Sequence, residues 1–308
     1  MKSTFFKRNF VFFWLFVLLF ASLAVQPARS YTLEDIMSYA FPSNLVAAPK
    51  GGIVAWVFNW QGKRNIWIAQ GPEFKARQLT QYSEDDGQEL GGLAFNFEGT
   101  IIIYVRGGSA NRAGEIPNPT SDPEGAEQAL WAVKLEGGEP WELAKGSSPV
   151  PSPSEDKLVF SARGQIYLLS LAESSRPELL FKARGRNGSP CWSPDGKKIA
   201  FVSSRGDHSF IGVYDLEGKV INWIAPSVDR DGYPVWSPCG KYIAFIRFPG
   251  SMATPAYRDG QRFALMAADV ESGMAQEIWS CPNETGGFSQ YYPDQTLRWA
   301  ADGYLVFY

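Results

Sequence analysis

The sequence predicts an all-β protein, a β-propeller of four-stranded antiparallel blades. The segment from Pro190 to Phe201 contains two short strands joined by a Pro-Asp-Gly turn, in which proline fixes φ and glycine accepts a positive φ. The same pattern returns from Pro234 to Phe245, an interval typical of one propeller blade. Aromatic residues make up 15% of the chain and glycines number 30, which is typical of many short strands connected by tight turns.

Further copies of this unit align on Trp192. The residues equivalent to it are Ala47, Phe95, Pro151, Trp236 and Trp299. The second strand of each copy is apolar on both faces, as expected for a strand covered by a blade on either side. These strands contain residues 54–56, 102–104, 158–160, 199–201, 243–245 and 305–307. Because third and fourth strands follow in all but the last copy, we predict five complete blades and the start of a sixth.

The sixth unit reaches Tyr308 after its second strand, so the predicted ring is incomplete. A propeller covers its strand edges and blade faces by closing its ring. We therefore expect the natural reading frame to continue beyond Tyr308. In the alternative, an N-terminal strand completes the last blade and closes the ring.

Residues 1–30 have the composition of a secretory signal peptide. Basic residues precede an apolar run from Val11 to Val25, and Ala28-Arg29-Ser30 supplies small residues for a cut before Tyr31. An uncleaved membrane anchor is the competing interpretation, although the run is short for a span of about 20 residues. We expect a mature propeller of residues 31–308, periplasmic or secreted, with no membrane attachment after cleavage.

Charge and cysteine content narrow the classes of partner. The net charge of −3 gives no attraction to nucleic acid. The three cysteines, Cys191, Cys239 and Cys281, allow at most one disulfide, and a Cys191–Cys239 bridge remains open. They show no metal-binding spacing and the chain has one histidine, so we expect no metal and no cofactor.

A short helix is expected from Leu33 to Ala40, capped by Thr32 with Asp35 three residues later.

Three long connections interrupt the repeat. Residues 106–128 and 248–261 lie between second and third strands, and residues 280–294 lie between a fourth and a first strand. All three connections should therefore emerge on the same rim. Polar loops on a rigid scaffold are where binding residues are commonly found. They are equally compatible with tolerated surface insertions.

One polar motif occurs at the same position in two blades. Arg186-Asn187-Gly188-Ser189-Pro190 is matched by Arg230-Asp231-Gly232-Tyr233-Pro234. The Asn-Gly and Asp-Gly pairs predict a turn before each first strand. Arg186 and Arg230 would then lie near the axial opening, where two guanidinium groups can hold a carboxylate. Alternatively, they form weak salt bridges at the rim with Asp229 or Asp231.

The sequence contains no recognisable catalytic motif of a serine hydrolase. The chain has no Gly-x-Ser-x-Gly, and its single histidine, His208, lies between Asp207 and Ser209. Adjacent side chains of an extended strand point to opposite faces, so these three residues are not expected to form a triad. Arg205, Asp207 and His208 are instead candidate substrate contacts in a loop, and no residue is assigned as catalytic.

An acidic cluster lies between the first two blades. Its members are Glu84, Asp85, Asp86 and Glu89. Their spacing differs from that of an EF-hand calcium loop. A solvated turn, or a contact to a cation or amine, is compatible with this pattern.

The Trp-Ser-Pro-Asp-Gly-Lys-Lys-Ile-Ala-Phe unit resembles the WD40-like repeat of TolB-type propellers and of the N-terminal propellers of S9 serine peptidases. The S9 family includes prolyl oligopeptidases, dipeptidyl peptidase IV and acylaminoacyl peptidases. Three segments, 41–49, 184–190 and 204–215, look like exported bacterial members of that family.

The resemblance implies a propeller that gates the access of peptides to a C-terminal α/β-hydrolase domain carrying Ser, Asp and His. That domain is absent from this chain, so no catalytic residue carries over, and we expect the chain alone to be inactive. The glutamate pair that holds a substrate amine in dipeptidyl peptidase IV has no match, because no Glu-Glu occurs. The alternative function is that of a TolB-like periplasmic propeller, whose partners would be proteins rather than peptide substrates.

Overall fold

The computed structural model describes residues 31–306 except 112–114, 122, 173–174, 249, 251–262 and 281–296. The chain divides into two units, Met1–Ala40 and Phe41–Tyr308. The predicted signal peptide lies outside the described residues. Within the described part, no helix is both long enough and apolar enough to cross a membrane.

The first unit contains the short helix α2 (Leu33–Met37). Thr32 Oγ1 accepts a hydrogen bond from Asp35 N, and Asp35 Oδ2 accepts one from Thr32 N, each at 3.0 Å. This reciprocal capping box confirms the predicted N-terminus of the helix. The helix ends at Met37 rather than at Ala40, because Ser38 is its C-cap and the Ser38 hydroxyl donates to the carbonyl of Asp35 at 2.8 Å.

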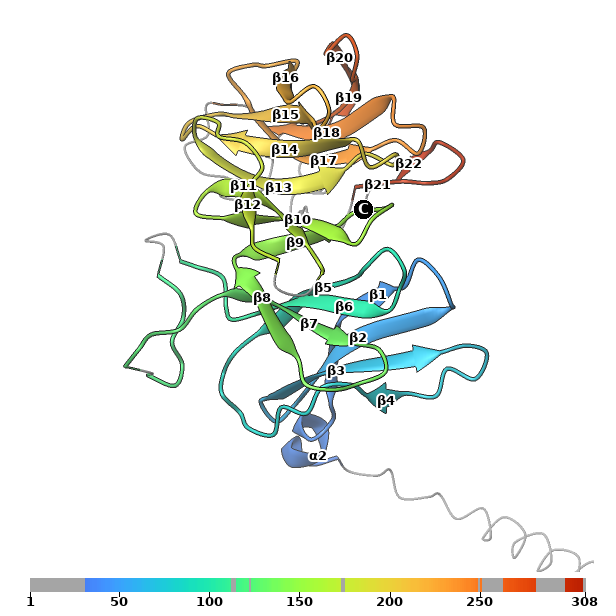
Figure 1. Ribbon diagram of the computed structural model, residues 1–308, viewed down its shortest axis with the longest axis vertical. Helices are drawn as coiled ribbons and strands as arrows, with labels where there is room; N and C mark the ends of the chain where they lie inside the picture. Colours follow the sequence, from blue (N-terminus) through green and yellow to red (C-terminus); the bar gives the residue numbers. More distant parts are fainter. Residues whose placement is uncertain are drawn as a thin grey trace, which may run out of the picture. The chain divides into compact units, whose positions relative to one another are not determined.

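The second unit consists of antiparallel blades that follow one another along the chain, and one parallel bridge, Ser209 to Arg230, joins the sheets of blades 4 and 5 (Figure 1). Blade 1 is β1 (Phe41–Ala47), β2 (Ile53–Trp60), β3 (Lys63–Gln70) and β4 (Arg77–Gln78); blade 2 is β5 (Leu90–Phe95), β6 (Ile101–Arg106), β7 (Ala129–Lys134) and β8 (Trp141–Lys145). Blade 3 is β9 (Ser147–Pro151), β10 (Lys157–Ala162), β11 (Gln165–Ser170) and β12 (Glu178–Leu179). Blade 4 is β13 (Arg186–Trp192), β14 (Lys198–Ser204), β15 (Ser209–Asp215) and β16 (Val220–Ile224). Blade 5 is β17 (Arg230–Trp236), β18 (Tyr242–Phe248), β19 (Ala264–Asp269) and β20 (Ala275–Ser280).

A two-stranded sheet of β21 (Arg298–Trp299) and β22 (Leu305–Val306) follows blade 5. The predicted sequence of four-stranded antiparallel blades is therefore confirmed in the described residues. The first strand of each blade contacts the first strand of the next, from β1 to β21.

The second strands form the core between blades. In β6, Ile102 and Tyr104 belong to a buried cluster with blade 1, whereas Ile103 and Val105 belong to a cluster with blade 3. Alternate side chains of one strand thus face the two neighbouring blades. This explains why the second strands are apolar on both faces, and why the aromatic residue of β6, Tyr104, is fully buried.

Tryptophan side chains also link consecutive blades. Trp192 Nε1 donates to the carbonyl of Val150 at 2.9 Å, and Trp236 Nε1 donates to the carbonyl of Cys191 at 3.2 Å. Trp299 Nε1 makes the corresponding bond to Val235 at 3.2 Å. Each indole therefore bonds to the first strand of the preceding blade.

The Pro-Asp-Gly turn forms as predicted. Gly196 has φ of +71°, and its N–H donates to the carbonyl of Ser193 at 2.9 Å. Asp195 Oδ1 accepts hydrogen bonds from the Ser193 hydroxyl at 2.6 Å and from Lys197 N at 3.1 Å. The side chains of Ser193 and Asp195 thus stabilise the turn.

The Asn-Gly and Asp-Gly pairs do not form the turns that the sequence predicted. Both pairs lie inside strands, β13 and β17, and the left-handed residues are the next ones, Ser189 (φ +48°) and Tyr233 (φ +59°). The pairing register shifts at these positions, as in a β-bulge. The equivalent bulge residues in blades 1 to 3 are Asn44, Gly92 and Ser148. The positive φ therefore belongs to a bulge within each first strand.

Cys191 and Cys239 are free thiols, so the disulfide left open by the sequence does not form. Cys191 Sγ lies 3.2 Å from the carbonyl oxygen of Pro234, and Cys239 Sγ lies 3.4 Å from the hydroxyl of Ser237. Cys281 lies outside the described residues.

Candidate functional site

A cavity of about 880 Å³ lies at the rim of blades 2, 3 and 4. Its walls come from the β6–β7 connection, the β8–β9 connection, the β10–β11 turn and the first half of β13. The lining residues are Ala110, Ile116, Ala126–Gln128, Lys145–Ser148, Ser161–Gly164, Arg186–Ser189, Val202 and Ser204.

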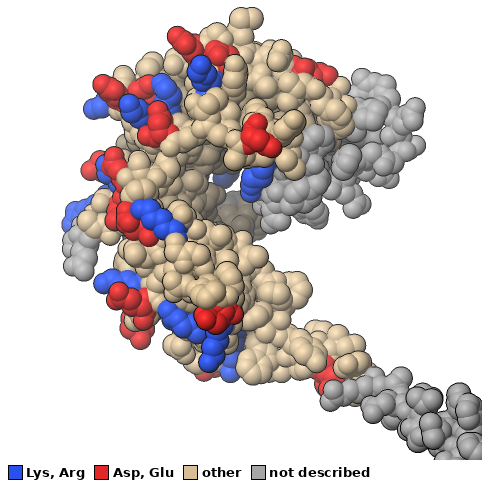
Figure 2. All heavy atoms as spheres, turned by 90° about the vertical axis from the view of Figure 1, so that its right-hand side faces the viewer, with Lys and Arg blue, Asp and Glu red and all other residues tan. Residues whose placement is uncertain are grey.

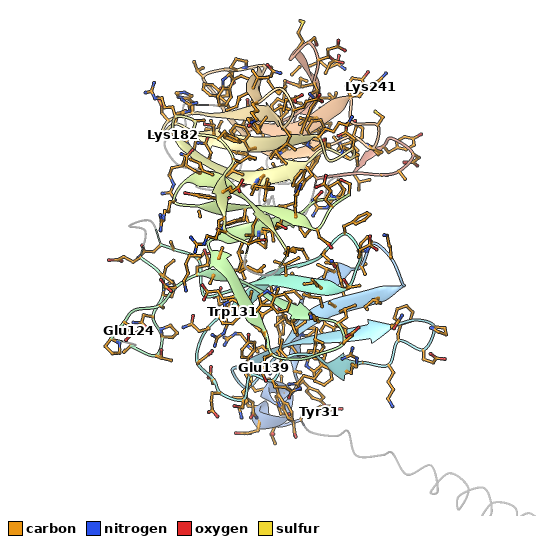
Figure 3. The ribbon with its side chains drawn as sticks, in the orientation of Figure 1. Tyr31, Glu124, Trp131, Glu139, Lys182 and Lys241 are labelled. Carbon is orange, nitrogen blue, oxygen red and sulfur yellow. The ribbon has the colours of Figure 1, made fainter. Side chains whose placement is uncertain are left out.

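The long connection between β6 and β7 supplies one wall of this cavity. Its position between a second and a third strand is the one that the sequence predicted. Glu124 marks the part of this connection that lies away from the sheets (Figure 3). The other two predicted long connections lie largely outside the described residues.

Arg163 and Arg186 are brought together from neighbouring blades. Asn187 N, at the start of blade 4, donates to the carbonyl of Gly164 in the β10–β11 turn of blade 3 at 2.8 Å. The stem of Arg186 lies over this turn, since a methyl group on Gly164 would be 3.6 Å from Arg186 Cγ. Within the described part of the chain, neither guanidinium has a hydrogen bond or an ion pair.

Lys145, the third cation of the cavity, is already compensated. Its ammonium group forms ion pairs with Glu127 and with Glu142, the latter at 3.0 Å. Partial burial by itself would lower the pKa of Lys145, but the hydrogen bonds to Glu127 and Glu142 raise it above its ordinary value. The uncompensated charge of the cavity therefore comes from Arg163 and Arg186.

Asn187 organises the polar wall below these arginines. Its side chain is 2% exposed, and Nδ2 donates to Gln165 Oε1 and to the carbonyl of Ala183, each at 3.1 Å. Asn187 Oδ1 and Ser161 Oγ are buried and have no hydrogen-bond partner among the described residues. The sequence predicted a turn at Asn187 but no role for it in a binding site, although Asn187 belongs to the motif repeated between blades 4 and 5.

Arg230 and Arg186 occupy equivalent positions in the repeated motif, but their contacts with the preceding blade differ. Arg230 Nη2 donates to the carbonyl of Gly206 in the β14–β15 turn at 2.8 Å, and Arg230 does not line the cavity. The adjacent Asp231 pairs with Arg247, with Nε–Oδ1 at 2.7 Å and Nη2–Oδ2 at 2.8 Å. The cavity thus combines Arg186 with Arg163 rather than with Arg230.

Arg205, Asp207 and His208 lie in and beside the same β14–β15 turn that Arg230 contacts. The guanidinium of Arg205 lies 5.6 Å from the ring centroid of Phe210 and 5.4 Å from that of Trp223. These cation–π contacts, together with a 3.1 Å hydrogen bond from Arg205 Nε to the Ser203 hydroxyl, fix its side chain on blade 4.

His208 Nδ1 and Asp207 Oδ1 are 2.6 Å apart. The expectation that these adjacent side chains point to opposite faces is wrong, because both residues lie in a turn and not in an extended strand. The hydrogen bond with His208 lowers the pKa of the Asp207 carboxyl below its ordinary value. Ser209 does not join them, because its buried hydroxyl donates to the carbonyl of Asp231 at 2.7 Å.

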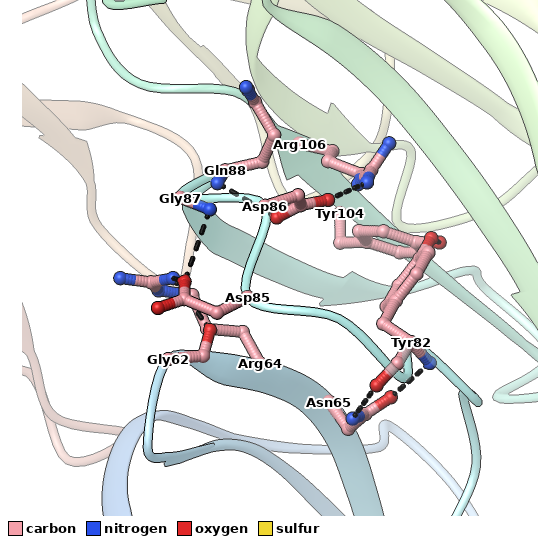
Figure 4. Close-up of polar contacts among 10 residues, drawn as sticks. All are labelled: Gly62, Arg64, Asn65, Tyr82, Asp85, Asp86, Gly87, Gln88, Tyr104 and Arg106. Carbon is pink, nitrogen blue, oxygen red and sulfur yellow. Dashed lines mark hydrogen bonds and ion pairs between the residues drawn. The ribbon is translucent and has the colours of Figure 1, made fainter. Parts of the chain in front are cut away.

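The acidic cluster supports the connection between blades 1 and 2 (Figure 4). Asp85 lies 3.7 Å from Arg64, and Asp86 forms an ion pair with Arg106. The same carboxylates accept hydrogen bonds from the backbone: Gly87 N donates to Asp85 at 3.2 Å, and Gln88 N donates to Asp86 at 2.9 Å. Two of the four acidic side chains therefore have cationic partners within the protein.

Basic and acidic side chains are interspersed over the face drawn in Figure 2. Among the residues that the structure describes, no group of three or more His, Cys, Asp or Glu side chains is arranged to hold a metal ion.

No known family model matches the chain, and no curated protein matches it. Solved structures do match. Putative TolB from Agrobacterium tumefaciens is 18% identical with a TM-score of 0.52, over 87% of this chain and 91% of that one. Oligogalacturonate lyase from Vibrio parahaemolyticus is 16% identical with a TM-score of 0.59, over 86% of this chain and 70% of that one. Dipeptidyl peptidase 4 from Porphyromonas gingivalis is 14% identical with a TM-score of 0.53, over 77% of this chain but only 39% of that one. The chain therefore has a β-propeller fold that is shared by TolB, S9 peptidases and a lyase.

Proposed function

We propose that this chain is the substrate-gating and positioning propeller of an exported S9-type serine peptidase. In this proposal, an α/β-hydrolase domain of the same protein carries out hydrolysis. The observation that carries the proposal is the cavity at the rim of blades 2 to 4. Its volume of about 880 Å³ falls within the range of ligand sites, and it offers two arginines that have no polar partner among the residues that the structure describes.

The cavity also coincides with the segments that resemble exported S9 peptidases. Arg186–Ser189 and Ser204, which line it, belong to two of those segments. A propeller that holds one part of a peptide limits the orientations in which the peptide can reach a nucleophile, and such positioning contributes to catalysis. We therefore assign both the gating and the positioning of peptide substrates to the rim of blades 2 to 4.

The chain by itself is expected to be inactive. Ser209, the serine next to Asp207 and His208, is buried and its hydroxyl is engaged by the carbonyl of Asp231. We expect the purified chain not to cleave aminoacyl or peptidyl chromogenic substrates. Labelling of this chain by a serine-reactive fluorophosphonate would contradict that expectation.

The proposal is tested on the native gene product. Antibodies raised against residues 31–308 are used to isolate the natural polypeptide from periplasm and culture medium, and the isolate is treated with a fluorophosphonate probe. We expect an exported polypeptide, heavier than residues 31–308 account for, that takes up the probe. A polypeptide of the size of residues 31–308 that takes up no probe overturns the proposal.

A second function is a TolB-like propeller that binds periplasmic proteins. The specific observation in its favour is that the chain spans 91% of one TolB structure and 54% of another, against 39% of the dipeptidyl peptidase 4 structure. Under this alternative, the same isolation yields an unlabelled polypeptide in a stable complex with other proteins.

A further inference from the structure

We infer that the rim cavity binds the carboxylate group of a peptide, held between Arg163 and Arg186. The identification of the ligand as a peptide rests on the proposed function. The identification of its carboxylate rests on the side chains of the cavity alone.

The cavity carries positive charge that the described residues do not compensate. Arg163 and Arg186 have no polar partner in the described part of the chain, whereas Lys145 is paired with two glutamates. A guanidinium group is planar and presents paired N–H donors that match the two oxygens of a carboxylate. Two such groups, Arg163 in the β10–β11 turn and Arg186 at the start of β13, therefore select an anionic ligand.

A backbone hydrogen bond between blades 3 and 4 fixes the positions of the two arginines. The hydrogen bond from Asn187 N to the Gly164 carbonyl joins the turn that carries Arg163 to the strand that carries Arg186. Asn187 is itself fixed by Gln165 and by backbone carbonyls of residues 183 and 185. The spacing of the two stems is thus built into the blade boundary, which lowers the cost of ordering them on a ligand.

Two buried polar atoms of cavity residues favour a peptide over a simple anion. Asn187 Oδ1 is a buried acceptor without a donor, and Ser161 Oγ is a buried hydroxyl without a partner. Such groups in a native protein call for a partner, and both residues line the cavity. A peptide carries backbone N–H donors as well as a carboxylate, whereas an anion without protons, such as sulfate, supplies acceptors only. Ile116 and Val202, which also line the cavity, provide apolar contacts for a side chain.

The test measures binding of short peptides to the purified exported chain by isothermal titration calorimetry. One pair is trialanine with a free C-terminus and its C-terminal amide. A second pair is N-acetylated, C-amidated Ala-Glu-Ala and Ala-Gln-Ala. In at least one pair we expect the carboxylate form to bind at least tenfold more tightly, and the pair that responds identifies the source of the carboxylate. Equal affinities within both pairs overturn the inference, and so does tighter binding of inorganic phosphate than of any of these peptides.

Variants identify the binding residues. Arg163→Gln and Arg186→Gln are each expected to weaken binding of the carboxylate peptide at least tenfold, and Arg186→Lys is expected to weaken it less. Arg184→Gln is the matched control: it removes the same charge from an exposed side chain two residues away that does not line the cavity, and it should leave affinity unchanged within twofold. Circular dichroism checks that every variant is folded. An equal loss in Arg184→Gln contradicts the inference.

The two experiments fail independently. If carboxylate binding is absent while the native polypeptide takes up fluorophosphonate, the inference falls and the proposed function stands. If carboxylate binding is present while the native polypeptide takes up none, the carboxylate site stands and the peptidase function falls.

Discussion

The indole nitrogen of Trp236 in blade 5 donates a hydrogen bond to the carbonyl oxygen of Cys191 in blade 4, at 3.2 Å. Trp192 and Trp299 make the same contact to their own preceding blades. The tryptophan that marks the repeat in the sequence therefore also forms a hydrogen bond between consecutive blades.

Trp236→Phe should destabilise the protein by removing this bond. Loss of one hydrogen bond costs about 1 kcal/mol, and the smaller ring leaves part of a buried site unfilled. We expect a lower urea midpoint with an unchanged m-value. Trp60→Phe is the control, because Trp60 is 60% exposed and its replacement should change stability by less than about 0.5 kcal/mol. Equal effects of the two substitutions would contradict an interblade role for Trp236.

Gly212→Ala should destabilise blade 4. A methyl group at this position would lie 2.5 Å from Cζ of Phe201, whose side chain is fully buried. Overpacking of this kind costs about 1–3 kcal/mol. Gly232→Ala serves as the control, since a methyl group there meets no atom within 4 Å. Thermal unfolding should show a lower melting temperature for the first variant only.

Arg247→Met should destabilise the protein strongly, and more so at neutral than at mildly acidic pH. Asp231 has a side chain that is 0% exposed, and removing one partner of a buried ion pair costs about 3–5 kcal/mol. Burial raises the pKa of Asp231 above its ordinary value, and Arg247 opposes that rise. Without Arg247, the folded-state pKa rises further, so stability is highest below the ordinary pKa and falls as pH rises through the folded-state value.

Urea unfolding across pH tests this dependence. Adding Asp231→Asn to Arg247→Met should remove the extra loss at neutral pH, because no charge is then buried. Lys198→Met breaks the more exposed Lys198–Asp215 pair and should cost less than about 1 kcal/mol. A loss in Arg247→Met that is independent of pH would show that the charge of Asp231 is not its cause.

Cys239 should react with iodoacetamide well before Cys191. Hydrogen bonds from the Ser237 hydroxyl and from the backbone of Lys241 lower the pKa of the exposed Cys239 thiol, whereas burial raises that of Cys191 to about 12. The thiolate is the reactive form, so Cys239 should be alkylated at lower pH than an ordinary cysteine. Mass spectrometry in a Cys281→Ser background follows the two sites. Ser237→Ala should shift the pH profile of Cys239 upward; an unchanged profile would contradict the assigned cause.

Some features of the candidate site could be predicted from the sequence. The motif that begins with Arg186 marked one wall of the cavity, and the connection between β6 and β7 marked another. The partner of Arg186 could not be predicted. Arg163 belongs to a different blade and no repeated motif includes it; it lines the same cavity as Arg186, at a blade boundary where Asn187 N bonds to the carbonyl of Gly164.

The sequence alone determined the blade repeat, the apolar second strands, the Pro-Asp-Gly turn at Gly196 and the capping box of Thr32 and Asp35. The turn and the capping box depend on residues a few positions apart, and the repeat and its apolar strands are visible because the same residue pattern returns from blade to blade. Tertiary structure decided the bulges at Ser189 and Tyr233, the contact between Asp207 and His208 in their turn, and the presence of Arg163 and Arg186 in one cavity. These depend on how neighbouring strands and blades are registered, which requires hydrogen bonds between residues far apart in the chain.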